Sequence, residues 1–210
     1  MKYPGKKTEN LRYFKIYKPY GVLSQFSDRS GRRTLAQYGP FPKDVYPVGR
    51  LDRDSEGLLF LTNDGRLKNL LIAPGFRHPR TYLVQVEKNP DEESLEKLRE
   101  GVIIEGVKTS KSRVELLSGT PQIAPRPVPI RYRRNIPTAW LRLTIYEGRN
   151  RQVRKMTAAV GHPTLRLVRI SIGTLRLGDL GPGESRPLTY DELRGLKDSV
   201  SGENRTGNRQ

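Results

Sequence analysis

Stretches in which apolar and polar residues alternate recur along this chain, and they constrain its fold more than any other feature. A period of two is typical of β-strands that bury one face. This alternation, together with one short apolar run, predicts strands over residues 13–17, 57–61 (the apolar run), 82–86, 140–146 and 165–172.

Helices are fewer. Residues 91–99 give the clearest signal, because Pro90 precedes them, acidic residues fill the first turn and Gly101 follows the last one. A second helix is predicted over residues 151–160, with Gly161 as its stop. The remaining expected elements are a helix within 190–197, helical turns at 35–38 and 67–72, and a turn at 74–76. Strands interspersed with few helices favour an α+β fold with a mainly antiparallel sheet.

The two ends of the chain are polar, and we expect residues 1–10 and 199–210 to be flexible tails around a folded part at 11–198. Residues 119–135 contain four prolines and four arginines. This composition predicts an extended loop or a distorted sheet edge that can touch RNA.

The formal net charge is +17 for 210 residues, and the pI is about 10.3. A polyanion is therefore the expected partner, because each phosphate that a basic residue neutralises releases bound counterions. RNA, DNA and acidic lipid all fit, but no apolar stretch approaches the roughly 20 residues that span a bilayer. In the predicted strand at 165–172, Arg166 and Arg169 interrupt the alternation, and we expect them to face solvent or RNA.

Cysteine is absent, which removes disulfides and thiolate chemistry and is compatible with the reducing cytoplasm. The two histidines, His78 and His162, do not have the spacing of a metal site. Neither glycine-rich nucleotide-binding pattern occurs. We therefore expect a cytoplasmic protein that works without metal or cofactor.

Residues 49–65 place three carboxylates and two arginines directly before an apolar run. An acid beside a fixed guanidinium can remain ionised and attack or deprotonate a substrate, which makes Asp52 a candidate. The commoner outcome for one such aspartate is a surface acid paired with Arg50 or Arg53. In an extended segment Asp52 and Asp54 would point in opposite directions, so they are not expected to converge on one bond as a glycosidase pair does.

Basic residues crowd the start of the predicted helix at 151–160. Cations there oppose the helix dipole by about 0.3–1 kcal/mol each when exposed, so stability gives no reason for them. An anion docked at this end would satisfy free backbone N–H groups and guanidinium groups together. The alternative is an ordinary basic, solvated face. The residues concerned are Arg149, Arg151, Arg154 and Lys155.

Three motifs, in this order, resemble the signatures of pseudouridine synthases of the RsuA type. The first is Gly49-Arg50-Leu51-Asp52 followed by an acid, a small hydroxyl residue, Glu-Gly and a leucine-rich strand. The second is Arg80-Thr81-Tyr82-Leu83-Val84, and the third is residues 147–156, EGRNRQVRKM. The resemblance covers roughly residues 12–190. Most members of the family carry a small N-terminal RNA-binding module, which we do not expect here.

This resemblance implies a cofactor-free isomerase that converts a specific uridine of ribosomal RNA, in the large subunit (23S), to pseudouridine. It implies a sheet of the pseudouridine synthase type in two subdomains that flank a cleft, within one catalytic domain at 11–198. Asp52 matches the catalytic aspartate, Arg154 the arginine that ion-pairs with it, and Tyr82 the tyrosine that stacks on the base. We expect substrate contacts from Tyr82, Arg154 and Arg50, and RNA contacts from Arg149, Arg151 and Lys155.

Two other classes of protein would also explain the positive charge. A non-catalytic ribosomal RNA-binding or assembly protein would give no reason for Asp52, Tyr82 and Arg154 to occur together. A nuclease would need carboxylates that converge on a metal ion, whereas the acids here are interleaved with arginines. By composition alone, Tyr82 fits a cross-strand core position equally well. We expect the chain to act as a monomer.

Overall fold

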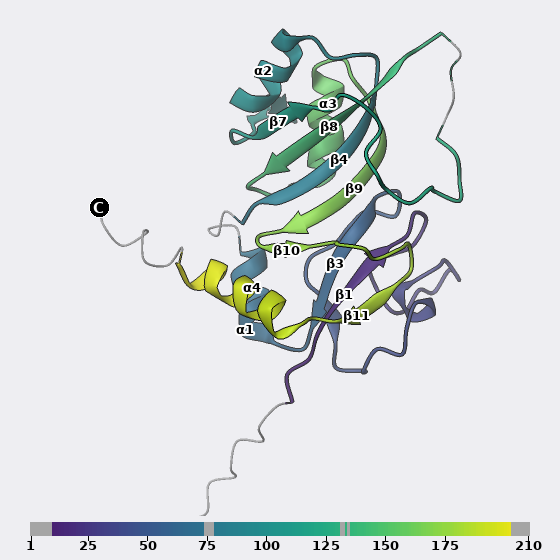
Figure 1. Ribbon diagram of the computed structural model, residues 1–210, viewed down its shortest axis with the longest axis vertical. Coiled ribbons are helices and arrows are strands. Elements are labelled where there is room, and N and C mark those ends of the chain that lie inside the picture. Colours follow the sequence, from purple (N-terminus) through teal and green to yellow (C-terminus); the bar gives the residue numbers. More distant parts are fainter. Residues whose placement is uncertain (1–9, 74–77, 131–132, 134, 203–210) are drawn as a thin grey trace, which may run out of the picture.

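A mixed β-sheet runs through the whole molecule (Figure 1). The computed structural model describes residues 10–73, 78–130, 133 and 135–202. Within these residues nine strands pair in the order β11-β1-β3-β9-β4-β8-β7, with β2 on β3 and β10 on β9. The strands are β1 (Tyr13–Lys18), β2 (Tyr46–Pro47), β3 (Glu56–Thr62), β4 (Arg80–Glu87), β7 (Arg113–Leu116), β8 (Thr138–Ile145), β9 (Thr164–Ile172), β10 (Leu175–Arg176) and β11 (Ser185–Pro187).

The pairing of β3 with β9 divides the sheet into an upper half (β9, β4, β8 and β7) and a lower half (β3, β1 and β11), as Figure 1 shows. This pairing is parallel and joins only Glu56 to Val168 and Gly57 to Arg169. Gly57 has φ +100°, and a Cβ atom there would lie 2.3 Å from the carbonyl oxygen of Arg169. Only glycine therefore lets the two halves meet this closely.

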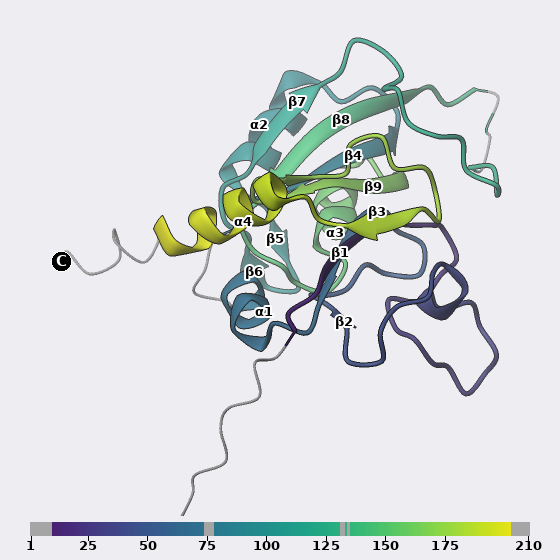
Figure 2. The same ribbon diagram turned by 60° about the horizontal axis from the view of Figure 1, so that its bottom comes forward.

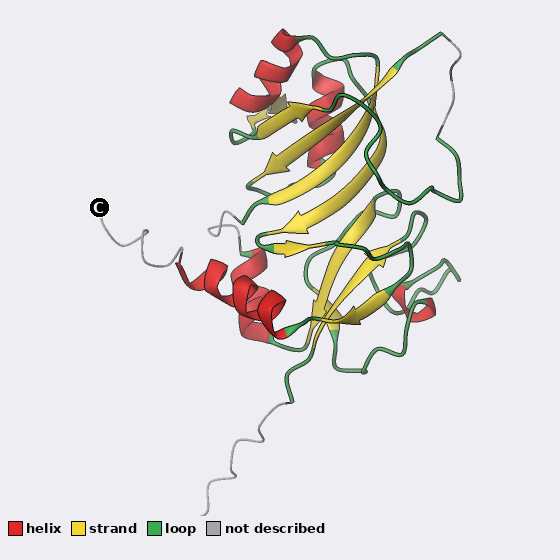
Figure 3. Cartoon of the chain, viewed as in Figure 1, coloured by secondary structure: helices red, strands yellow, loops and turns green. Residues whose placement is uncertain are grey.

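Two helices cover one face of the upper half, α2 (Glu92–Glu100) and α3 (Gln152–Ala159) (Figure 3). Alternate residues of β4, among them Tyr82 and Val84, pack there with Leu98 of α2 and Met156 of α3. A hairpin of β5 (Ile103–Ile104) and β6 (Val107–Lys108) lies beside α3 (Figure 2). This packing places the start of α3 next to the junction of the two halves.

The lower half is covered on both faces. Leu58 and Phe60 of β3 face a core shared with α1 (Gly65–Ile72) and α4 (Tyr190–Gly202). Leu59 and Leu61 face the opposite side, which includes the 3₁₀ helix Leu35–Gln37. Strand β3 is therefore apolar throughout because its two faces are both buried.

Every strand and helix predicted from the sequence is present, with bounds that differ by a few residues. Among the strands of the described residues, every pairing in this sheet except that of β3 with β9 is antiparallel, so the predicted α+β class with a mainly antiparallel sheet is confirmed. Residues 119–130 form a loop without helix or strand, as expected. The predicted turn at 74–76 and residues 1–9 of the predicted N-terminal tail lie outside the described residues.

Two predictions are wrong. Arg166 and Arg169 do not face solvent: both side chains are buried, because β9 is an inner strand between β3 and β4. The predicted C-terminal tail begins too early, since α4 continues to Gly202. Leu196 and Val200, four residues apart on one helical face, are both buried in the core and hold this extension in place.

Candidate active site

A cleft of about 620 Å³ opens at the junction of the two halves. Its walls come from the loop before β3, from β4 and β9, and from the loop that leads into α3. Five of the seven residues predicted for the site line it, namely Arg50, Asp52, Tyr82, Arg149 and Arg151. Arg154 and Lys155 are not among the lining residues.

Asp52 lies in a tight turn rather than in an extended segment. The Ser55 N–H donates to the Asp52 carbonyl oxygen at 3.0 Å. The preceding residue is held by buried Ser24, whose hydroxyl accepts from the Leu51 N–H at 3.0 Å and donates to the Leu51 carbonyl oxygen at 2.8 Å. These bonds fix the backbone on both sides of the carboxylate, whose side chain remains 34% exposed to the cleft.

The guanidinium that reaches Asp52 belongs to Arg151. Its Nη1 lies 3.6 Å from Asp52 Oδ2, and its two terminal nitrogens donate to both oxygens of Asp54 at 2.9 and 2.8 Å. Arg151 caps α3 with φ 52° and ψ 31°, a left-handed conformation that is strained for a residue with a Cβ atom. The prediction that Asp52 and Asp54 diverge is wrong, because the turn brings both carboxylates to one guanidinium.

Arg154 has a different partner from the one predicted. Its Nη2 donates to the Asp54 carbonyl oxygen at 2.7 Å and lies 3.5 Å from the Asp54 carboxylate. Burial lowers the pKa of Arg154, Asp54 raises it in part, Arg151 lowers it further, and Asp52 raises it by less than Asp54 does. The direct ion pair of Arg154 is therefore with Asp54, and the expected pair with Asp52 is a wrong prediction.

Asp54 connects the two arginines to the loop before β3. Burial raises the pKa of its carboxyl group, but the hydrogen bonds from Arg151 and the charges of Arg154 and Arg151 outweigh burial and lower the pKa overall. Asp54 is thus held as an anion between two cations. It fixes Arg151 in the position from which the guanidinium reaches Asp52.

Tyr82 stands on β4 in the wall of the cleft and is 7% exposed. Leu167 and Ile172 of β9 line the same wall. Tyr82 also packs in the core of the upper half, so its core role and its cleft role coexist. The wall offers apolar surface and one phenol to a planar ligand.

The remaining predicted residues lie at the margin of the site. Arg50 is exposed at the rim, and Arg149 is exposed while its guanidinium donates to the carbonyl oxygens of Val107 and Lys108. Lys155 pairs with Glu105 in the turn of the β5–β6 hairpin at 2.7 Å. Lys155 therefore faces the hairpin rather than the cleft.

Sequence reasoning missed Ser24 and Gln152 at the cleft, and it named Arg169 only as a residue that faces solvent or RNA. Buried Gln152 accepts from the Arg149 N–H at 3.0 Å and donates to Glu147 at 2.7 Å, which braces the loop before α3. The signal for Arg169 was available, because a charged residue within a strand that is apolar on both faces requires a partner or a function.

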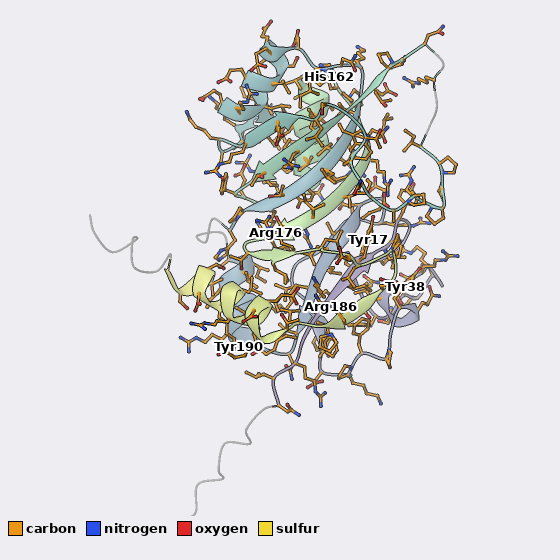
Figure 4. All side chains as sticks on the ribbon, viewed as in Figure 1. Tyr17, Tyr38, His162, Arg176, Arg186 and Tyr190 are labelled. Carbon is orange, nitrogen blue, oxygen red and sulfur yellow. The ribbon has the colours of Figure 1, made fainter. Side chains whose placement is uncertain are left out.

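The histidines do not form a site. His162 lies at the far end of the upper half (Figure 4), where its Nδ1 is 3.1 Å from the Glu87 carbonyl oxygen. His78 contacts the Leu70 carbonyl oxygen. The described residues contain no group of three metal-binding side chains. None of the helices in the described ranges is long and apolar enough to cross a membrane.

Known proteins resemble this chain in sequence and in structure. Residues 12–159 match the model of a family described as RNA pseudouridylate synthase. The ribosomal large subunit pseudouridine synthase E of Vibrio parahaemolyticus is 54% identical over 180 residues, which cover 86% of this chain and 75% of that protein. The protein of the same name from Xanthomonas axonopodis pv. citri is 57% identical over 169 residues, which cover 80% and 88%.

A solved structure described as a pseudouridylate synthase superimposes with a TM-score of 0.75 and 30% sequence identity. The superposition covers 90% of this chain and 74% of that one. Family model, relatives and solved structure agree with one another and with the three sequence motifs. The chain therefore belongs to the RNA pseudouridylate synthase family.

Proposed function

We propose that this pseudouridine synthase converts one specific uridine of ribosomal RNA, in the large subunit, to pseudouridine. The proposal rests on the cleft, which Asp52, Arg151 and Tyr82 line together. The target RNA is inferred from the relatives, two of which are named for the large ribosomal subunit. The net charge of +17 supports binding to a long polyanion.

Asp52 is the proposed catalytic residue. Isomerisation breaks the bond between ribose C1′ and uracil N1, turns the base, and joins C1′ to C5. The Asp52 carboxylate either attacks C1′ or removes a ribose proton, and both roles need a fixed carboxylate that is open to the ligand. The Ser24 contacts and the turn at Ser55 fix it, and its exposed side chain reaches the cleft.

Three further residues have proposed roles. Tyr82 stacks on the uracil after the nucleotide leaves its helix, replacing part of the lost stacking energy, roughly 1–3 kcal/mol per base. Arg151 orients Asp52 directly, and Arg154 orients it through the Asp54 backbone. Arg50 and Arg149 at the rim contact the phosphates around the target, and Lys155 contributes charge from the hairpin side.

We also propose that the enzyme acts as a monomer in the cytoplasm, where ribosomes are assembled. Support comes from the cleft, whose described walls are supplied by one chain. Light scattering of the free protein and of its RNA complex would measure the mass. A mass of two chains in the active complex would contradict this proposal.

The test of function uses ribosomal RNA labelled with tritium at uridine C5. Formation of the C1′–C5 bond displaces the C5 hydrogen, so turnover releases tritium to water. Chemical modification of pseudouridine followed by primer extension then maps the position. We expect release of one equivalent per RNA and one site in the large-subunit RNA. RNA binding without tritium release would favour a non-catalytic ribosomal RNA-binding protein.

A further inference from the structure

Arg169 is a buried cation in the cleft wall without a balancing acid. It lies on β9 at the junction with β3, is 3% exposed, and lines the cleft beside Tyr82. Its Nε donates to the Leu58 carbonyl oxygen at 2.8 Å, whereas its Nη2 has no hydrogen-bond partner among the described residues. No carboxylate in the described ranges lies within ion-pairing distance of it.

A second buried arginine on the same strand shows what a purely structural role looks like. Arg166 donates to both oxygens of Glu56 at 2.9 Å and to the Ala124 carbonyl oxygen at 2.8 Å. Its charge and its donors are thus satisfied within the fold. Arg169, three residues later, has one bond to a backbone carbonyl and the Tyr82 hydroxyl beside it, and its buried Nη2 has no partner among the described residues, so the fold alone does not account for it.

The surroundings of Arg169 make the cleft wall more positive still. Burial lowers its pKa, the neighbouring Arg80 lowers it further, and the Tyr82 hydroxyl beside it raises it in part. Burial lowers the pKa of Lys18, on the lower half, to about 7; the carboxylates of Glu56, Asp54 and Asp52 raise it in part, and the charge of Arg169 lowers it slightly further. Such a site favours a ligand that carries negative charge when it reaches the wall.

The reaction produces such a ligand. When the C1′–N1 bond breaks, its electron pair stays on the base, and the uracil becomes an anion with charge spread over N1, O2 and O4. Asp52 compensates the electron-poor ribose, either by a covalent bond to C1′ or by accepting a ribose proton. After the base has turned, C5 bonds to C1′ while the Asp52–C1′ bond breaks or Asp52 returns the ribose proton; C5 then loses its proton, and N1 gains one. Charge and atoms therefore balance within the site.

We propose that Arg169 is a catalytic residue that stabilises the departing uracil anion through its free Nη2 donor, with the Tyr82 hydroxyl beside it. This inference rests on the proposed function. A phosphate is the other anion available, but the exposed arginines at positions 50 and 149 stand at the rim where the RNA backbone passes. Arg169 is 3% exposed in the wall of the cleft, so a ligand group has to insert into the cleft to contact it, as a flipped base does.

The test compares RNA that carries uridine or 5-fluorouridine at the target position. Fluorine withdraws electrons and stabilises the base anion, so cleavage of the fluorinated nucleotide needs less help from the protein. In single-turnover reactions we expect Arg169→Gln to slow consumption of uridine on the order of 100-fold with RNA affinity nearly unchanged. The loss on 5-fluorouridine should be clearly smaller, on the order of tenfold.

Arg50→Gln is the matched control, because it removes a cleft guanidinium at the rim. It should weaken RNA binding and affect both substrates by the same factor. If Arg169→Gln slowed the consumption of uridine and of 5-fluorouridine by the same factor, the inference would be overturned. If it lowered only the affinity for RNA, Arg169 would be assigned to a phosphate contact. If Arg169→Gln lowers the unfolding temperature sharply, Arg169→Lys, which keeps the charge, carries the comparison and should show a smaller loss with the same substrate dependence. If the wild type releases tritium, the proposed function stands, and a failed comparison then counts only against the role of Arg169.

Discussion

At Arg151 the backbone conformation determines which carboxylates the guanidinium contacts. Its left-handed φ of 52° turns the guanidinium back from the start of α3 toward the loop before β3, where it meets Asp54 and Asp52. The motif EGRNRQVRKM shows which arginines are available, but the handedness at 151 is not visible in it. The pair with Asp52 was assigned to Arg154, which lies one helical turn further on, by the resemblance to the family.

Arg151→Ala and Arg151→Gly separate the effect of the guanidinium on catalysis from the effect of the left-handed backbone on stability. Both remove the guanidinium, and we expect both to lower kcat by up to about 100-fold, because a misplaced carboxylate loses the reactive geometry. Glycine adopts the left-handed conformation freely, so the glycine variant should be more stable than the alanine variant by roughly 1 kcal/mol. Urea unfolding and tritium release measure the two quantities. Equal stability of the variants would contradict the strain at this residue.

At the scale of elements, the junction of β3 and β9 carries the site. β3 follows the turn that holds Asp52, and β9 brings Arg169 and Leu167 to the cleft wall. The alternation pattern located both strands, but it did not predict their parallel pairing. Arg166 and Arg169 were expected to face solvent or RNA, because a local pattern does not show that an inner strand has two buried faces.

Gly57→Ala tests the junction. The new Cβ would approach the Arg169 carbonyl oxygen to 2.3 Å at a φ of +100°. We expect a loss of about 3 kcal/mol or more in the free energy of unfolding, because the clash involves backbone and adds to the strain. Gly65→Ala at the start of α1 is the control: a Cβ there meets nothing within 4 Å, so stability should remain or rise by roughly 0.5–1 kcal/mol. Similar melting temperatures for the two variants would contradict the close approach.

The start of α4 is held by an acid that gives stability a pH dependence. Glu192 accepts from Lys15 and Arg186 and from the Thr189 N–H, and its own N–H donates to the Thr189 hydroxyl, which completes a capping box. Arg186 and Tyr190, the first residue of α4, are labelled in Figure 4. Hydrogen bonds from Arg186 first, and then from Lys15, lower the pKa of Glu192 from 4.5 to about 2.

The contribution of Glu192 is therefore present above pH 4.5 and lost as the pH falls through about 2, because the unfolded chain takes up the proton first. We expect Glu192→Gln to cost on the order of 2 kcal/mol at pH 7, allowing for solvent screening of Arg186. The gap to the wild type should shrink between pH 4.5 and 2 in urea unfolding curves. Asp198→Asn, at an exposed pair on the same helix, should show almost no gap. A Glu192→Gln gap that does not change with pH would contradict the assignment.

At the scale of the whole molecule, the charge and the fold class were predictable from the sequence. The composition shows the excess of basic residues, and the periodicity predicts the elements of both halves of the sheet. The residues of the catalytic motif came from the resemblance to a family. The pairing of Asp54 with two arginines and the burial of Arg169 depend on contacts between positions about a hundred residues apart, which no local pattern encodes.

The positive charge should appear as a salt dependence of RNA affinity. We expect log Kd to rise linearly with log salt concentration, and Arg149→Gln to reduce the slope by about 0.7–0.9 if its guanidinium neutralises one phosphate. Arg142→Gln is the control, since Arg142 pairs with Glu115 away from the cleft residues. An unchanged slope in Arg149→Gln would remove Arg149 from the RNA interface.

The central claim is that the carboxylate of Asp52 performs the isomerisation, and the most direct measurement is single-turnover tritium release by Asp52→Asn beside the wild type. Asparagine keeps the size of the side chain but neither attacks C1′ nor accepts a ribose proton. We expect no detectable release, with RNA affinity and melting temperature close to those of the wild type, while Asp179→Asn, at an exposed turn, releases tritium normally. Release by Asp52→Asn at the wild-type rate would contradict the account.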